Sequence, residues 1–137
     1  MRTVKTIIAS CKKLYIEIIW LRDEGLCQWC HGEKGPAEQV HHIIERSLSA
    51  YLFYDLLNLI LLCKKCHCKY GHDKAAGIYW FEHAFPARWE YLHSPICDEM
   101  GRKMPRRNII KRSWKKQDYE EIEIVLKEKL SELKGGV

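Results

Sequence analysis

Two short cysteine motifs decide the fold of this chain: residues 27–30 read Cys-Gln-Trp-Cys, and residues 63–67 read Cys-Lys-Lys-Cys-His. Each Cys-x-x-Cys turn presents two sulfurs on one side, and four thiolates complete the tetrahedron that structural zinc prefers. The sequence between the motifs is too short to bury a large core, so the metal would contribute directly to folding. We therefore predict a structural zinc ion held by Cys27, Cys30, Cys63 and Cys66.

Histidines surround these cysteine motifs. His41 and His42 lie between the two motifs, Asn58 follows them, and His67 comes directly after the last cysteine. A neutral imidazole binds divalent transition metals, and its ordinary pKa of about 6.5 suits a general base near neutral pH. The sequence thus provides for a second, open metal site beside the closed one.

The composition describes a globular protein of 137 residues, with 47% hydrophobic and 30% charged residues. This length predicts a single domain over residues 1–137. No run of about 18 apolar residues is present, so no membrane span is expected. Lysines interrupt the apolar start of the chain too early for a signal peptide. Seven cysteines in such a chain indicate metal ligands in a reducing compartment, and we expect a cytoplasmic location.

Positive charge is concentrated in residues 102–116, which contain eight lysines and arginines and no acid, whereas the whole chain carries a net charge of +5. Such a block suits a phosphate backbone, because each neutralised phosphate releases counterions. A solvated linker has the same composition, so the two interpretations stay open. The candidate DNA contacts within this stretch are Arg106, Arg107, Lys111 and Arg112.

Hydrophobic periodicity predicts helices on both sides of a short hairpin. Apolar residues at helical spacing predict a first helix over residues 3–24, ended by Gly25 at C′, and a last helix that Asp118 N-caps. The last helix carries an apolar stripe, for which packing on the first helix is the simplest account. Between them we expect strands at 39–44 and 58–62, a loop at 45–57, and helices at 63–70, 75–84 and 87–93. Aromatic residues of the two later helices are expected to pack in the core rather than to stack on bases.

The run Val-His-His-Ile-Ile-Glu-Arg-Ser at residues 40–47 and the run Asn-Leu-Ile-Leu-Leu-Cys-Lys-Lys-Cys-His at 58–67 resemble the HNH endonuclease family. The resemblance covers residues 27–72 and implies an α+β fold: a ββα-metal core, with a two-stranded antiparallel hairpin and a short helix stapled by zinc, surrounded by further helices. Residues 73–134 form a helical C-terminal extension that is similar to those of small phage and prophage HNH proteins, some of them linked to recombination.

The resemblance also implies roles for individual residues. His42 would be the general base, Asn58 would orient the His42 ring through a hydrogen bond, and a divalent ion (Mg, Mn, Ni or Zn) would bind to His41 and His67. Products with 5′-phosphate and 3′-hydroxyl ends follow from the family mechanism. Many relatives carry Asp where this chain has His41, and two imidazoles favour Mn, Ni or Zn over Mg.

Two further positions have two interpretations each. His72 lies five residues after His67 and is either a third ligand or a surface histidine, depending on how Gly71 affects the helix. Arg46 is either a phosphate contact or a surface arginine. Adjacent strand residues point to opposite faces, so His41 and His42 can serve one phosphate only if the strand ends or twists there, and a fully regular strand through both would count against a shared site.

Three classes of function fit these features. The first is an endonuclease acting on DNA, as a monomer or a homodimer. The second is a non-catalytic zinc-containing DNA-binding module, and the third is a protein-interaction domain that uses its last helix. The joint presence of His42, Asn58 and His67 favours the first, because a binding module needs neither a base nor an orienting amide.

Overall fold

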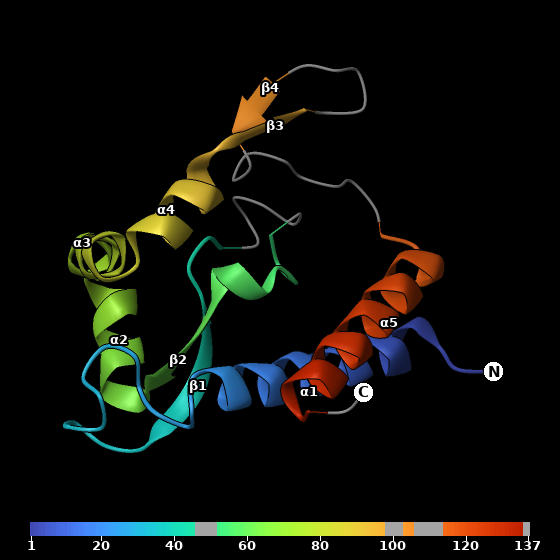
Figure 1. Ribbon diagram of the computed structural model, residues 1–137, viewed down its shortest axis with the longest axis horizontal. Coiled ribbons are helices and arrows are strands. Elements are labelled where there is room, and N and C mark those ends of the chain that lie inside the picture. The colour runs from blue at the N-terminus through green and yellow to red at the C-terminus, as the bar shows by residue number, and fades with distance from the viewer. Residues whose placement is uncertain (46–51, 98–102, 106–113, 136–137) are drawn as a thin grey trace.

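The computed structural model describes residues 1–45, 52–97, 103–105 and 114–135. An antiparallel hairpin is followed directly by a helix, which confirms the predicted α+β core (Figure 1). In chain order the elements are α1 (Val4–Arg22), β1 (Ala37–His42), the 3-10 helix η1 (Leu56–Asn58), β2 (Leu59–Cys63), α2 (Lys64–His72), α3 (Lys74–Ala84), α4 (Pro86–His93), β3 (Pro95–Cys97), β4 (Lys103–Pro105) and α5 (Lys116–Leu133).

The hairpin β1–β2 lies between two groups of helices, with α1 and α5 on one side and α2, α3 and α4 on the other (Figure 1). All five residues of β2 are buried, because alternate side chains enter two separate cores. Leu59 and Leu61 enter the α1-side core, whose other buried members are Ile7, Cys11, Tyr15, Ile18, Ile19, Ala37, Tyr119 and Leu126. Ile60 and Leu62 enter the α2-side core, with Cys27, Ile43, Ile44, Leu52, Cys63, Cys66, Tyr70, Phe81 and Leu92.

A buried two-stranded sheet needs partners for its free backbone edge, and the C-terminal end of α1 supplies them. The Asp23 carboxylate accepts a hydrogen bond from the Leu61 N–H at 2.9 Å, and the Gln28 N–H donates to the Leu61 carbonyl at 3.0 Å. Arg22 donates to the Leu59 carbonyl. These residues replace a third strand, so α1 and the hairpin form one packed unit.

The last helix packs against the first, as its apolar stripe predicts. Tyr119 and Leu126 are buried there, whereas Val125 is 61% exposed and lies outside the contact. The guanidinium of Arg2 binds both oxygens of the buried Glu123 at 2.7 and 2.8 Å, and this contact lowers the pKa of Glu123 to about 2. The ion pair between Arg2 and Glu123 thus joins the start of the chain to α5.

Several predicted boundaries are wrong by a few residues. Helix α1 ends at Arg22, and the left-handed C′ position is occupied by Glu24 rather than by Gly25. Gly25 follows C′, and its N–H donates to the Trp20 carbonyl. Helix α2 continues through Gly71 to His72. Asp118 does not N-cap α5: it lies in the first turn and accepts from the Lys115 N–H at 2.8 Å.

The first strand is also shifted. It runs from Ala37 to His42 rather than over 39–44, with an irregularity in register between Ala37 and Gln39. Ile43 and Ile44 leave the ladder because their N–H groups bond to Asn58 instead. Lys103–Pro105 pairs with Pro95–Cys97, so part of the stretch predicted as a basic loop is a strand.

The aromatic side chains of α3 and α4 pack mainly in the core, as predicted: Phe81 is fully buried, and Trp80, Phe85 and Trp89 pack against the α2-side core. No helix in the described ranges is both long and apolar enough to cross a membrane.

Candidate metal centres and catalytic site

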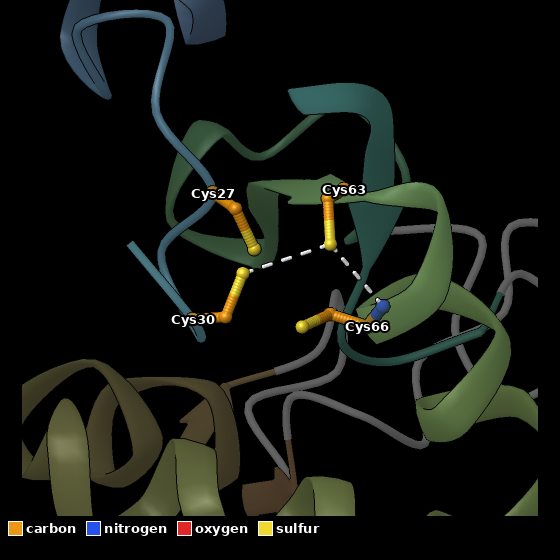
Figure 2. Close-up of side chains that lie close together, drawn as sticks. All are labelled: Cys27, Cys30, Cys63 and Cys66. Carbon is orange, nitrogen blue, oxygen red and sulfur yellow. Dashed lines mark hydrogen bonds between the residues drawn. The ribbon is translucent and has the colours of Figure 1, made fainter. Parts of the chain in front are cut away.

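The four predicted cysteines lie together where the loop after α1 meets the junction of β2 and α2 (Figure 2). Their sulfur atoms all lie within 4.8 Å of one another, and Cys30 Sγ and Cys63 Sγ are 3.7 Å apart. Zinc–sulfur bonds of about 2.3 Å in a tetrahedron place the sulfurs about 3.8 Å apart. The cluster can therefore hold a zinc ion with little rearrangement.

Backbone amides support this cysteine cluster. The Lys34 N–H and the Cys66 N–H each point at a sulfur, with distances of 3.4 Å to Cys30 Sγ and 3.4 Å to Cys63 Sγ. Burial raises the pKa of the Cys63 and Cys66 thiols. Burial also opposes ionisation of Cys30, but the Lys34 amide and the neighbouring thiols lower its pKa to about 7. Metal binding replaces the protons on all four sulfurs, so the cluster suits a cation better than it suits four thiols.

The second group of ligand-type side chains lies beside α2. The His41 ring lies edge-on to the His67 ring, with centroids 5.2 Å apart, and at 4.2 Å from the Tyr70 ring. His41 Nε2 and Tyr70 Oη are buried, and neither has a hydrogen-bond partner among the residues that the structure describes. An unsatisfied buried polar atom costs about 1–3 kcal/mol. A divalent ion bound by His41 Nε2 and His67 would remove this cost, so the residues present fit such an ion.

Burial keeps His41 in the form that binds metals. Desolvation, with smaller contributions from His67 and His42, lowers the pKa of His41 to about 4. The ring is therefore neutral at pH 7 and has a lone pair available for a cation.

His42 occupies a different environment from its neighbour. Its ring stacks on Phe53 with centroids 4.3 Å apart and meets the edge of Tyr15 at 5.9 Å. His42 Nε2 lies 3.1 Å from the Phe53 carbonyl oxygen. Since a carbonyl only accepts, Nε2 carries the proton, and Nδ1 is the basic nitrogen of the neutral ring. Burial lowers the pKa of His42, against the opposing effect of the Phe53 carbonyl.

The two adjacent histidines therefore point to opposite faces of the hairpin. Both are within the ladder, His41 opposite Ile60 and His42 opposite Leu59, and β1 ends at His42. His41 faces α2, whereas His42 faces α1 and the segment that contains Phe53. The strand is regular through both residues but stops at the second. In this arrangement His42 is not a third ligand of an ion held by His41 and His67.

Asn58 does not make the hydrogen bond expected of it. Its side-chain oxygen accepts from the Ile44 N–H at 2.7 Å, and its amide nitrogen donates to the carbonyls of Ile44 and Leu52, both at 3.0 Å. Its backbone carbonyl accepts from the Ile43 N–H at 2.8 Å. The expected bond to the His42 ring is thus replaced by bonds to the backbone, because the fully buried Asn58 joins the two ends of the connection between β1 and β2.

The remaining predicted site residues contribute less to this geometry. His72 is the last residue of α2 and is exposed, and among the described residues no contact joins it to His41 or His67. Arg46, Arg106, Arg107, Lys111 and Arg112 lie outside the described residues.

Sequence reasoning missed two aromatic residues that shape the site. Tyr70 covers His41, and Phe53 fixes the His42 ring through stacking and through its carbonyl. The position of Tyr70, one helical turn after His67, was a usable signal. The contact with Phe53 depends on a long connection whose path has no sequence signature.

Residues 27–73 match the model of the family described as HNH endonuclease. This segment is therefore similar to an HNH endonuclease domain, and its four clustered cysteines agree with the four-cysteine type. No curated protein and no solved structure matches the chain.

Proposed function

We propose that this chain is a metal-dependent endonuclease that hydrolyses phosphodiester bonds of DNA. The observation that carries the proposal is the state of two adjacent side chains at the end of β1. His41, next to His67, has a buried ring nitrogen that no described residue bonds, and His42 has its ring fixed by Phe53. A purely structural histidine pair would have its polar atoms satisfied within the protein.

His42 is the proposed general base. The Phe53 carbonyl holds the proton on Nε2, which leaves Nδ1 to accept a proton from water. Among the described residues Nδ1 has no hydrogen-bond partner, so it is the ring nitrogen available to accept this proton. A lowered pKa keeps the ring neutral at pH 7, as a base requires.

His41 and His67 are the proposed ligands of the catalytic ion. These two residues would hold a divalent ion, which would supply positive charge to the phosphate and the leaving oxygen. Two imidazoles favour Mn, Ni or Zn over Mg. His72 is exposed at the end of α2, so the proposed ligands are His41 and His67 alone.

His41 and His42 lie on opposite faces at the end of β1, and this arrangement suits a metal ligand on one face and a general base on the other. Hydrolysis by in-line displacement needs a base on the side of the attacking water and positive charge on the side of the leaving oxygen. His42 and His41 diverge from consecutive positions, so a phosphate at the end of β1 could be approached from both sides. The basic stretch 102–116 is proposed to bind backbone phosphates, and the resemblance of the extension to phage proteins supports a role in phage DNA processing or recombination.

The test is nicking of supercoiled plasmid by zinc-loaded protein with added Mg, Mn, Ni or Zn. Wild type should nick the plasmid in an ion-dependent manner, and His42→Ala should lose about 10²- to 10⁴-fold in rate. His83→Ala is the matched control, because His83 is exposed on α3 and its ring contacts Tyr79 rather than the site. If His42→Ala cuts as fast as wild type, the base assignment is wrong; if wild type binds plasmid and never cuts it, the chain is a DNA-binding module.

A further inference from the structure

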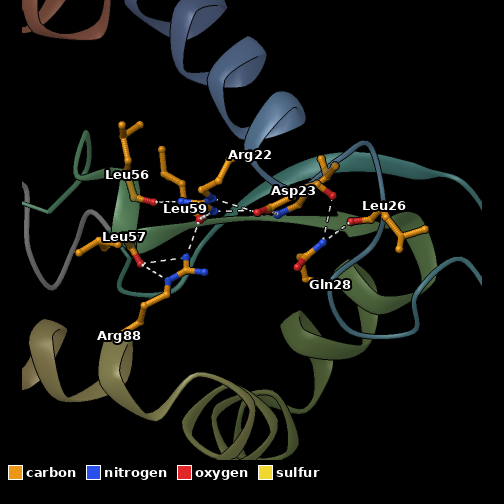
Figure 3. Close-up of polar contacts among 9 residues, drawn as sticks. Arg22, Asp23, Leu26, Gln28, Leu56, Leu57, Leu59 and Arg88 are labelled. Carbon is orange, nitrogen blue, oxygen red and sulfur yellow. Dashed lines mark hydrogen bonds and ion pairs between the residues drawn. The ribbon is translucent and has the colours of Figure 1, made fainter. Parts of the chain in front are cut away.

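Two arginines from outside the HNH segment converge on the turn that carries Asn58 (Figure 3). Arg22 is the last residue of α1, and Arg88 lies on α4. Both donate to the Leu59 carbonyl, which directly follows Asn58. The turn is thus held from both sides by helices that are not part of the catalytic motif.

Arg88 makes the more extended contact of the two. Its Nε and Nη2 lie 3.2 and 3.0 Å from the Leu57 carbonyl oxygen, and Nη2 lies 2.8 Å from that of Leu59. Its guanidinium also lies over the rings of Phe81 and Phe85, at 5.3 and 5.0 Å from their centroids. One planar group therefore holds the carbonyls on both sides of Asn58.

Helix α4 contacts the same turn a second time. Tyr91 donates from its hydroxyl to the carboxylate of Asp55, and Asp55 accepts from the Leu57 N–H at 3.0 Å, which begins η1. On the other side, Arg22 Nη1 lies 2.6 Å from the Leu56 carbonyl oxygen, and the Arg22 charge is paired with Asp23. The carbonyls of residues 56, 57 and 59 are all bound by guanidinium groups.

The position of this turn is passed on to the histidines by Asn58. Asn58 binds the N–H groups of Ile43 and Ile44, which directly follow His42 in the chain. It also binds the Leu52 carbonyl, next to the Phe53 that holds the His42 ring. A shift of the turn would therefore move both the backbone that carries His42 and the carbonyl that fixes its tautomer.

We infer that Arg88 is a positioning residue for catalysis, which acts through the Leu57 and Leu59 carbonyls and Asn58 on the orientation of the His42 ring. The inference rests on the proposed nuclease function. It gives the C-terminal extension a role in chemistry beyond DNA contact, because α4 becomes part of the support of the active site.

The position of Arg88 is electrostatically unfavourable for its guanidinium. Burial, together with the nearby charge of Arg22, lowers the pKa of Arg88 to about 10. The two cations share one carbonyl and repel each other, and the carboxylates of Asp23 and Asp55 oppose this repulsion. A lysine keeps the charge but presents a single ammonium, which cannot reproduce the fixed fork that reaches Leu57 and Leu59 together.

The test compares Arg88→Lys with Arg2→Lys in the full zinc-loaded chain. Arg2 also uses both arms of its fork, but it binds Glu123 at the α1–α5 contact. In Arg88→Lys we expect kcat for plasmid nicking to fall about ten- to a hundredfold with KM within about twofold, because small displacements of catalytic groups reduce rates on this scale. We expect the Ile44 amide to exchange its hydrogen at least about tenfold faster, with Leu126 in α5 unchanged. Arg2→Lys should change neither kcat nor the exchange of Ile44.

The two readouts separate this inference from the proposed function. If wild type cuts no DNA, the nuclease proposal fails, and the exchange of Ile44 alone decides whether Arg88 positions the turn. A rise in KM at constant kcat would make Arg88 a DNA contact and overturn the inference. Unchanged exchange at Ile44 would overturn it as well, even in an active nuclease.

Discussion

The cysteine cluster lies at the end of the hairpin where Cys63 ends β2, whereas His41 and His42 lie at the opposite end, where β1 stops. The two sites differ in how completely their polar atoms are bonded within the protein. The cysteine sulfurs lie within 4.8 Å of one another and receive backbone N–H groups, so a zinc ion completes a closed unit. At the other end of the hairpin, the buried Nε2 of His41 has no hydrogen-bond partner within the described part of the chain. A closed cluster stabilises the fold, whereas an open one retains bonding capacity for a ligand. Stability and chemistry should therefore respond to different substitutions.

The largest effect is expected for Cys63→Ser, which replaces a zinc ligand by a hydroxyl. Zinc binding to small zinc domains contributes on the order of 10 kcal/mol at neutral pH, so the variant should lose bound zinc and cooperative unfolding. Zinc content and thermal unfolding followed by circular dichroism would measure both. Cys68→Ser is the control, since Cys68 is exposed and outside the cluster, and it should behave as wild type. A Cys63→Ser protein with full zinc and an unchanged Tm would remove the structural role of the cluster.

His67→Ala should show the opposite pattern. We expect it to keep its zinc and its fold, but to bind Mn or Ni more than about a hundredfold less tightly, since loss even of groups that support metal ligands costs 10- to 100-fold. Isothermal titration of the zinc-loaded protein would measure the affinity. His72→Ala provides the comparison on the same helix, and we expect no change because His72 is exposed at its end. An equal loss of Mn or Ni affinity in His67→Ala and His72→Ala would indicate that His72 is a third ligand.

The buried His41 should make stability depend on pH. Its pKa is about 4 in the folded protein, compared with about 6.5 when unfolded, so the unfolded chain binds more protons between these values. The contribution of neutral His41 is complete above pH 6.5 and decreases as the pH falls towards 4, by about 3 kcal/mol in total. Urea unfolding of wild type and His41→Asn across this range would measure it. A difference between the two proteins that does not vary with pH would contradict the prediction.

The smallest effect is expected at Gly77, where α3 packs on the ring that covers His41. A Cβ atom added there would lie 2.5 Å from Tyr70 Cδ2, so Gly77→Ala should destabilise the protein by about 1–3 kcal/mol and displace Tyr70. Gly71→Ala is the matched helical control: nothing lies within 4 Å of its added Cβ, and a small gain in stability of about 0.5–1 kcal/mol is expected. Chemical denaturation would measure the free energy of unfolding of both variants, and a Gly77→Ala protein as stable as Gly71→Ala would contradict the prediction.

The same contrast explains how much could be predicted from the sequence. The cysteine cluster was predictable because ligand type and spacing alone determine a zinc knuckle. The burial of β2 on both faces followed from its unbroken apolar run. The residues proposed for the histidine site were chosen from their resemblance to a known motif. The contacts that these residues make could not be predicted in that way.

Contacts with backbone groups were the part that could not be predicted. Asn58 binds the backbone of Ile44 and Leu52 rather than a histidine, and Arg88 binds the carbonyls of Leu57 and Leu59. Every residue has a carbonyl and nearly every residue an N–H, so no sequence pattern marks which of them a side chain will meet. The short strands β3 and β4 were missed for a related reason, since three-residue strands are too short to show periodicity.

The most direct test of the account is a chelator titration of the zinc-loaded protein, with plasmid nicking and circular dichroism measured on the same samples. Two separate transitions are expected: nicking is lost first, as the ion leaves His41 and His67, while the fold remains until zinc leaves the four cysteines. Loss of nicking and fold in a single transition would contradict the account, because one metal site would then serve both purposes.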